Sequence, residues 1–487
     1  GAPNISVVSD NEAIEQVYSD HHFASSYEQA AALCMNASTD LDLGDTTYIK
    51  YLPVALKDNL VQLETIQRAV WRSLYLRIRV GDFDPVPLVP YQWINASQIN
   101  TPDSQALNLK MTAESIVLLK NTGTLPLKIF SIEKLAVIGP NANASTTLLS
   151  NYQGIPAFIT TVYEGIKSTG VPVEYAPGCP DVTCANKSSF SQALAVAADA
   201  DFVIAVMGLD GTVEGEGHDR VNTTCDSQPV DNLALPGCQT ALVEEIIAVN
   251  PRVILVLING GPVSIPTLYA NSGVLAILEA FYPGPLGGNA VSDVLFGEYN
   301  PGGRLPYTVL HDTTQLPVAT DYNMTTPPGR THRYYTGKPL FPFGYGLSYT
   351  TFKYSGLVLS ASTITVCSTL SVKVSVQNVG DVAGDDVIQI YVEPPRLSGM
   401  PFIPNIQLVG FERVSSLPVA GNYTGSFEVN AYLLSLVDRD GEHYVFPGSY
   451  TVVVTDGADN RLTAPFVIEG SVTNVKECPG APSCLAC

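Results

Sequence analysis

The chain has 487 residues, of which 46% are hydrophobic and 15% are charged, a composition typical of a folded protein with more than one domain. Asp and Glu total 46 against 25 for Lys and Arg, and the net charge of −21 argues against nucleic acid and anionic membrane surfaces as partners. No apolar run reaches the roughly 18 residues that a membrane span requires, so no membrane segment is predicted.

The first 88 residues predict two units of a strand followed by a helix. An apolar run at residues 5–8 ends in Ser9 and Asp10, and a helix is expected to begin at Ser25 or Ser26. A second extended piece at residues 39–42 precedes another helix. That helix has apolar residues at helical spacing, namely Leu63, Ile66, Val70 and Leu74. Prolines in segment 84–105 then predict a linker, because proline fixes φ and lacks an amide donor.

From about residue 106 to 310, short apolar runs alternate with helical segments. The expected strands are Leu135–Ile138, Phe202–Met207, Val253–Ile258 and Val274–Leu278, and one expected helix is Thr240–Val249. Alternation of this kind predicts a mainly parallel sheet with helices on both faces. Ligands of such sheets bind beyond the carboxyl ends of the strands, so the loop after Met207 is the candidate site.

After a connector rich in Tyr, Pro and Gly, the pattern changes to short alternating runs. These are Leu370–Val376, Val387–Val392, Gln407–Phe411, Gly425–Val429 and Tyr450–Val454. Several short strands separated by turn residues, without a long helix, predict an immunoglobulin-like sandwich.

The cysteines and glycosylation sequons favour a secretory route and an extracellular location. Cys179/Cys184 and Cys225/Cys238 are close pairs in loops, and no nearby His completes a zinc-type spacing, so disulfides are favoured over a metal site. A further cluster lies in the tail, at Cys478, Cys484 and Cys487. Eight Asn-x-Ser/Thr sequons occur, at Asn4, Asn36, Asn95, Asn143, Asn186, Asn222, Asn323 and Asn422.

Two acidic positions are candidates for chemistry. Asp10 follows an apolar strand, where barrel enzymes place catalytic groups, although an Asp there is also a common helix cap. The loop GLDGTVEGEGHDR at residues 208–220 contains Glu214 and Glu216 among glycines, but a solvated acidic loop has the same pattern. His218 in this loop is interpreted as a structural hydrogen-bonding residue.

Several segments, in this order, resemble glycoside hydrolase family 3, and specifically its β-xylosidase branch. They include VSDNEAIEQVYSDHH, ESIVLLKNTGTLPL, GLDGTVEGEGHDR, NLALPGCQ, FYPGPLGGNAVSDVLFGEYNPGGRLPYT and FPFGYGLSYTTF. The resemblance covers residues 1 to about 470. It implies a multidomain α/β plus all-β protein with part of a (β/α)₈ barrel, an α/β sandwich and a fibronectin type III-like β-sandwich. The expected boundaries are 1–88 for the barrel part, 89–105 for a linker, 106–325 for the α/β sandwich, 326–352 for a connector, 353–470 for the β-sandwich and 471–487 for a Cys-containing tail.

The resemblance also implies the site. The Asp of the family's VSD motif is the nucleophile, which corresponds to Asp10, and the first Glu of its TIEAEG loop corresponds to Glu214 as acid/base, with Glu216 in reserve. A retaining glycosidase uses one ionised and one protonated carboxyl group in this way and needs no metal or cofactor. A whole barrel takes roughly 250 residues, so residues 1–88 supply only its last two strand-helix units.

The leading hypothesis is therefore a retaining exo-acting β-D-xylosidase that removes terminal xylose from short β-linked oligosaccharides. The chain is expected to be N-terminally incomplete and inactive alone if no barrel segment or second chain completes it. The alternatives are a β-glucosidase or α-L-arabinofuranosidase of the same family, or a noncatalytic carbohydrate-associated remnant, since part of a barrel exposes sheet edges.

Overall fold

A computed structural model describes residues 5–44, 46–216, 220–318, 320–397, 402–438 and 440–479. Within these ranges the chain forms two compact units. The boundary between them along the chain falls between Ile99 and Asn100. None of the helices in the described ranges has the length and apolar character that a bilayer crossing requires.

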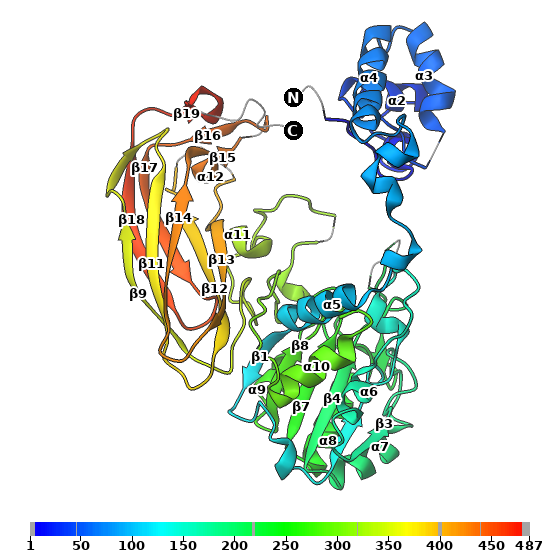
Figure 1. Cartoon of the computed structure of the whole chain (residues 1–487), viewed down its shortest axis with the longest axis vertical. Helices are drawn as coiled ribbons and strands as arrows, with labels where there is room; N and C mark the ends of the chain where they lie inside the picture. The colour runs from blue at the N-terminus through cyan, green and yellow to red at the C-terminus, as the bar shows by residue number, and fades with distance from the viewer. Residues whose placement is uncertain are drawn as a thin grey trace. The chain divides into compact units, whose positions relative to one another are not determined.

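The first unit is built from four helices. Its elements are α1 (Ala13–Ser19), α2 (Tyr27–Asn36), α3 (Thr47–Lys57), α4 (Leu63–Arg79) and the short 3₁₀ helices η1 (Val86–Leu88), η2 (Pro90–Trp93) and η3 (Ala96–Gln98) (Figure 1). The predicted capping is confirmed for α2, where the Ser26 side chain accepts from the Gln29 N–H and the Gln29 Oε1 accepts from the Ser25 N–H at 2.6 Å. Helices α1 and α3 were not predicted.

The two predicted strands of this unit are reduced to one parallel bridge between Val8 and Leu41. The Ser9 N–H donates to the Leu41 carbonyl at 2.9 Å, and the Asp40 N–H donates to the Val7 carbonyl at 2.7 Å. The apolar stripe of α4 is largely uncovered within this unit, with Leu63 54% and Val70 51% exposed. A single pair of extended segments and an uncovered helix face leave much of the apolar surface in contact with water.

The second unit begins with a six-stranded sheet of order β1-β8-β7-β4-β2-β3. Five strands are parallel and the edge strand β1 is antiparallel to β8. The strands are β1 (Val117–Asn121), β2 (Leu135–Ile138), β3 (Val173–Ala176), β4 (Phe202–Gly208), β7 (Val253–Ile258) and β8 (Val274–Glu279). The four strands predicted for this region are confirmed, whereas β1 and β3 were not predicted.

Helices cover both faces of this sheet, as predicted. Residues of α7, α8 and α9 pack on one face, and residues of α5, α6 and α10 pack on the other (Figure 1). These helices are α5 (Pro102–Ser115), α6 (Val162–Lys167), α7 (Phe190–Ala198), α8 (Gln239–Val249), α9 (Pro266–Ala270) and α10 (Gly287–Phe296). Helix α5 begins inside the segment predicted to be a linker, because Thr101 caps it and Pro102 is tolerated in the first helical turn.

Short elements connect the sheet strands and lead to the next domain. They are η4 (Ile129–Ser131), η5 (Thr146–Leu149), the hairpin of β5 (Thr224–Cys225) and β6 (Gln228–Pro229), η6 (Thr313–Gln315) and α11 (Thr331–Tyr334). The hairpin lies in the loop between β4 and α8, which contains the candidate acidic residues.

The C-terminal part of the second unit is a β-sandwich, as predicted. One sheet has the order β10-β18-β17-β12-β13 and the other β14-β11-β9 (Figure 1). Their strands are β9 (Phe352–Leu359), β10 (Thr363–Thr365), β11 (Leu370–Asn378), β12 (Gly384–Glu393), β13 (Gln407–Leu417), β14 (Asn422–Val429), β17 (Gly448–Thr455) and β18 (Arg461–Glu469). A small sheet of β15 (Leu436–Val437), β16 (His443–Val445) and β19 (Thr473–Asn474) accompanies α12 (Ala431–Leu434) and η7 (Val475–Glu477).

Buried polar contacts join the sandwich to the α/β part of the same unit. Arg304 forms an ion pair at 3.1 Å with Asp386 on β12, and the Tyr354 hydroxyl donates to the same carboxylate at 2.8 Å. Asp386 is fully buried, which costs free energy because its carboxylate loses contact with water. The charge of Arg304 and the hydroxyl of Tyr354 offset part of this cost. A disulfide between Cys367 and Cys478 connects the loop before β11 to the end of η7. The sequence had grouped Cys478 with Cys484 and Cys487, which lie outside the described residues.

Candidate active site

The candidate acidic loop begins where β4 ends at the carboxyl edge of the parallel sheet. Gly208 is the last residue of β4 and has a φ of +148°. A side chain at this position would collide with the carbonyl of Ile258 on the neighbouring strand β7. Glycine is therefore required for β4 and β7 to end side by side, and the chain can then leave the sheet directly into the loop.

Glu214 lies in this loop and is held by two donors. The Arg220 guanidinium forms an ion pair with Oε2, through Nε at 2.7 Å and through a second contact from NH2. The N–H of Gly261, from the loop after β7, donates to Oε1 at 2.9 Å. The Glu214 side chain remains 28% exposed, so the carboxylate is fixed in orientation while part of it faces solvent.

Arg220 is itself fixed by backbone carbonyls. Its NH1 donates to the carbonyl of Asn232 at 2.9 Å and to that of Pro262 at 3.0 Å, and the side chain is 11% exposed. The sequence identified Arg220 only as one charge among several in the loop. Its function as the partner of Glu214 depends on the fold, because Asn232 approaches it from a later part of the same loop and Pro262 from the loop after β7.

Glu216, the reserve candidate, differs from Glu214. It is exposed, and no hydrogen bond or ion pair joins it to another described residue. His218 and Asp219 lie outside the described residues, so the interpretation of His218 remains a prediction. Of the two glutamates, Glu214 is the one whose position the described part of the fold determines.

Several buried polar atoms near the carboxyl edge of the sheet have no hydrogen-bond partner among the described residues. They are Asn141 Oδ1, Asn259 Oδ1, the Tyr282 hydroxyl and the Tyr307 hydroxyl. Burial, together with the carboxylates of Glu214 and Asp210, raises the pKa of Tyr282 to about 12. Glu279, the last residue of β8, is also buried there, and burial raises its pKa to about 8. None of these polar residues stood out in the sequence, because no local pattern groups them: Asn141, Asn259 and Tyr282 follow different strands, Glu279 ends β8, and Tyr307 comes after α10.

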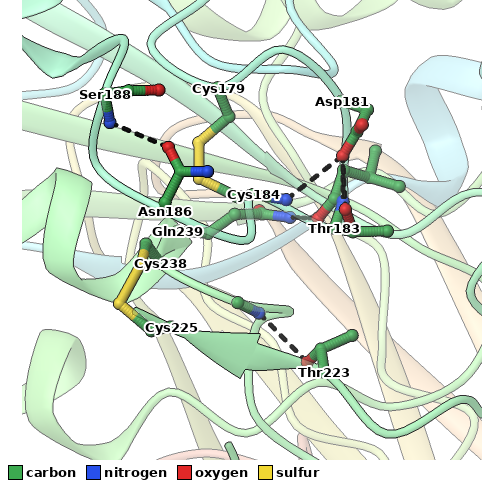
Figure 2. Close-up of a disulfide and its surroundings, with 12 residues drawn as sticks. Cys179, Asp181, Thr183, Cys184, Asn186, Ser188, Thr223, Cys225, Cys238 and Gln239 are labelled. Atoms are coloured by element: carbon green, nitrogen blue, oxygen red, sulfur yellow. Dashed lines mark hydrogen bonds between the residues drawn. A yellow bond between two sulfur atoms is a disulfide. The ribbon is translucent and has the colours of Figure 1, made fainter. Parts of the chain in front are cut away.

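One disulfide closes the far end of the acidic loop, and a second, from the connection between β3 and α7, lies beside it. Cys225 is bonded to Cys238 and Cys179 to Cys184, as the close spacing had predicted (Figure 2). The two bridges lie together, since the Cys238 N–H donates to the Cys184 carbonyl at 2.8 Å. Cys225, Asp226 and Cys238 are the one set of potential metal ligands that lie together in the described ranges. Because both sulfurs are bonded to each other, this set lacks the thiolates that a zinc site needs.

Asp10 lies in the first unit, at the end of the bridged segment and before α1. Its carboxylate is exposed, and its Oδ1 accepts from the Asn11 N–H at 2.7 Å. The segment that leads to it is held by Asp40, whose Oδ2 accepts from the Val7 N–H at 3.0 Å. Asp40 is in turn paired with Arg72 of α4, with Nε donating to Oδ2 at 2.9 Å. A partly buried ion pair thus fixes the backbone at Val7, three residues before Asp10.

Comparisons with known proteins identify the two domains of the second unit. Residues 116–349 match the Glycosyl hydrolase family 3 C-terminal domain, and residues 386–458 match the Fibronectin type III-like domain. Thus the fold of the second unit is that of a glycosidase C-terminal region followed by a β-sandwich. Residues 116–349 therefore form the C-terminal domain of glycosyl hydrolase family 3, the family that the motifs had indicated.

Three proteins are similar to the chain over most of its length. A probable exo-1,4-beta-xylosidase bxlB of Aspergillus flavus is 34% identical over 97% of this chain and 61% of its own length. The beta-xylosidase/alpha-L-arabinofuranosidase 1 of Medicago sativa subsp. varia is 35% identical over 92% of this chain and 60% of its own length. The solved structure of the GH3 exo-beta-xylosidase XlnD with a xylobiose aziridine probe is 29% identical, with a TM-score of 0.85, and covers 99% of this chain and 63% of that chain. The chain therefore spans about three fifths of the length of these relatives.

Proposed function

We propose that the chain is part of a retaining exo-β-glycosidase, most specifically a β-D-xylosidase that releases terminal xylose from short β-linked xylo-oligosaccharides. The observation that carries the proposal is Glu214, a carboxylate fixed by Arg220 and Gly261 at the carboxyl edge of the sheet in a loop of this family. The names of the fungal and plant relatives and of the XlnD structure support xylose as the substrate sugar.

In this proposal Asp10 is the nucleophile. Its carboxylate attacks the anomeric carbon, and a covalent xylosyl ester forms as the bond to the leaving oxygen breaks. Glu214 gives its proton to that oxygen and later takes a proton from the water that hydrolyses the ester. Arg220 and the Gly261 N–H stabilise the anion that Glu214 becomes after it has given up its proton.

Variants of the two loop glutamates test which is the acid/base. We expect Glu214→Ala to lower turnover of aryl xylosides with poor leaving groups by about 10²–10⁴-fold. Azide should restore turnover of an activated aryl xyloside and give xylosyl azide, because this anion attacks the covalent ester in place of water and needs no base to activate it. If Glu216→Ala shows this pattern and Glu214→Ala does not, the role belongs to Glu216 and Glu214 is a structural partner of Arg220.

The name of the plant relative favours one further activity, α-L-arabinofuranosidase. A panel of nitrophenyl glycosides with xylose, arabinofuranose and glucose configurations separates these activities by their kcat/KM values. We expect the xyloside to be preferred. A preference for arabinofuranoside or glucoside would leave the family unchanged and reassign the substrate.

We also propose that further polypeptide, either a barrel segment or a second chain, covers the first unit when the enzyme is active. The supporting observation is the exposed apolar surface of that unit, which includes Leu63 and Val70 of α4. The intact mass and the subunit composition of the purified protein test this directly. An active protein that consists of these 487 residues alone would contradict this proposal. It would mean that these residues complete the active site without further polypeptide.

We further propose that the protein is secreted and glycosylated. The described residues contain three disulfides, which persist in oxidising compartments. Several sequon asparagines lie at the surface, among them Asn95 and Asn222. Treatment with a peptide N-glycosidase should lower the mass of protein taken from the culture medium of the source organism.

A further inference from the structure

A carboxyl group that the proposed mechanism does not use lies at the same edge of the sheet as Glu214. Glu279 is the last residue of β8 and is 2% exposed. Its register partner on the parallel strand β7 is Leu257, and Asn259 comes directly after that strand. The side chains of Glu279 and Asn259 are therefore brought together where both strands end.

A continuous set of hydrogen bonds runs from Glu279 toward the catalytic loop. The Asn259 Nδ2 donates to Glu279 Oε2 at 3.1 Å and to the Gly261 carbonyl at 3.0 Å. The other oxygen of Glu279, Oε1, accepts from the Phe281 N–H at 3.1 Å. Asn259 is fully buried, and its Oδ1 has no partner among the described residues. The orientation of its amide thus depends on two acceptors, and Glu279 is one of them.

Gly261 carries this contact to Glu214. Its N–H donates to Glu214 Oε1 at 2.9 Å, while its carbonyl accepts from Asn259. A side chain on Gly261 would overlap the Glu214 carboxylate and would lie 2.9 Å from the Arg220 NH2. Only glycine fits at this position, and a shift of the Gly261 peptide would either move the Glu214 carboxylate or break the hydrogen bond that holds it.

Packing alone does not explain a glutamate at position 279. No arginine, lysine or histidine pairs with it among the described residues, and its two donors are neutral. Burying a carboxyl group without a charged partner costs free energy, which an apolar side chain of similar size would avoid. The hydrogen bond to Asn259 is what the carboxyl group adds and an apolar residue would lack.

We propose that Glu279 is a positioning residue that acts through Asn259 to fix the Gly261 peptide, whose N–H holds the Glu214 carboxylate. The inference rests on the proposed acid/base function of Glu214. It goes beyond that function by assigning a role to a buried residue of the sheet, which touches neither substrate nor Glu214.

The kinetic test compares two substrates in the whole active protein. Xylobiose has a poor leaving group that needs the proton of the acid, whereas 2,4-dinitrophenyl β-D-xyloside has a leaving group that departs without it. We expect Glu279→Leu to lower kcat/KM for xylobiose by about tenfold and that for the dinitrophenyl substrate by less than about twofold. Glu279→Gln, which keeps one acceptor oxygen, should lie between Glu279→Leu and the natural protein. A loss of folded protein alone would lower both values by the same factor.

Two further variants separate the possible outcomes. Asn250→Ala removes an equally buried amide at the opposite end of β7, where Nδ2 donates to the carbonyls of Ala197 and Ala200, and it should leave the ratio of the two kcat/KM values unchanged. If Glu214→Ala changes the ratio and Glu279→Leu does not, the positioning inference is wrong and the function of Glu214 stands. If Glu214→Ala leaves the ratio unchanged, it is the proposed function that fails.

A crystallographic test does not depend on activity. In Glu279→Leu the distance from the Gly261 nitrogen to Glu214 Oε1 should exceed about 3.5 Å, the limit of a hydrogen bond. In Asn250→Ala this contact should remain. An unchanged Gly261–Glu214 contact in Glu279→Leu would overturn the inference, whatever the kinetics.

Discussion

The side chain of Gln239 binds both backbone groups of Gly208. The Gly208 N–H donates to Gln239 Oε1 at 2.8 Å, and the Gln239 Nε2 donates to the Gly208 carbonyl at 2.9 Å and to that of Val182 at 2.6 Å. Gln239 is fully buried at the start of α8, directly after the disulfide-bonded Cys238 (Figure 2). The beginning and the end of the acidic loop are thus joined through one side chain.

Replacing Gln239 should therefore destabilise the second unit. Gln239→Leu keeps the size of the side chain but leaves the N–H and carbonyl of Gly208 buried without partners, each at a cost of about 1–3 kcal/mol. We expect the free energy of unfolding to fall by about 3 kcal/mol, measured by urea denaturation. A loss below about 0.5 kcal/mol, as at an ordinary surface position, would show that this side chain does not hold the loop.

The disulfide between Cys225 and Cys238 should also stabilise the loop. Its two cysteines are 13 positions apart, and loop-closure entropy gives about 3 kcal/mol for a bridge of this size. The paired replacement of both cysteines by serine should lower the melting temperature and increase proteolysis between β4 and α8. Equal proteolysis of the variant and the natural protein would contradict this prediction.

Removal of metal ions should have no effect on this region. Cys225 and Cys238 form a disulfide, so neither sulfur is a thiolate ligand. Asp226 alone then offers a metal ion a single carboxylate, which binds weakly. We expect a chelator to leave the melting temperature unchanged and a thiol reductant to lower it. The reverse result would mean that the two sulfurs bind a metal ion.

Glu279 should make stability depend on pH. Burial raises its pKa from the ordinary value of 4.5 to about 8. Between these pH values the folded protein holds a proton that the unfolded chain has lost, so the free energy of unfolding falls as pH rises, by about 1.4 kcal/mol per pH unit. The effect is absent below about pH 4.5 and complete above about pH 8. Denaturation curves of Glu279→Gln should lack this slope, and a slope equal to that of the natural protein would contradict the assignment.

The ion pair of Arg304 and Asp386 should respond differently to single and double substitutions. Arg304→Met leaves the buried Asp386 carboxylate without its charge partner, and we expect a loss of about 3–5 kcal/mol. The double variant Arg304→Met, Asp386→Leu removes both charges and should recover much of that loss. If the double variant is less stable than both single variants, the two side chains do not stabilise each other and the prediction is wrong.

Much of the fold could be predicted from apolar patterns. Val253–Ile258 matches β7 residue for residue, because a buried parallel strand is a continuous apolar run bounded by polar residues. The edge strands β1 and β3 were missed: β1 ends in Lys120 and Asn121, and Val173–Ala176 contains Glu174 and Tyr175. Edge strands are paired on one side only and carry polar residues, so their sequences are weaker signals.

The site could be predicted only in part. Glu214 was found through a family motif that also contains Arg220, but nothing in the motif pairs the two side chains. Gly261 follows β7 and Glu279 ends β8, and the parallel sheet brings these distant residues to the same edge as Glu214. The ion pair of Asp40 with Arg72 spans 32 positions and likewise has no local pattern in the sequence.

The most direct test of the central claim is to trap the covalent intermediate. Incubation of the active protein with a 2-fluoro-xyloside or a xylose-configured aziridine, followed by proteolysis and mass spectrometry, identifies the labelled residue. We predict a label on the peptide that contains Asp10, with fragmentation placing it on Asp10 itself, and no label in Asp10→Ala. A label on any other carboxylate, or rapid turnover without a trapped species, would contradict the account.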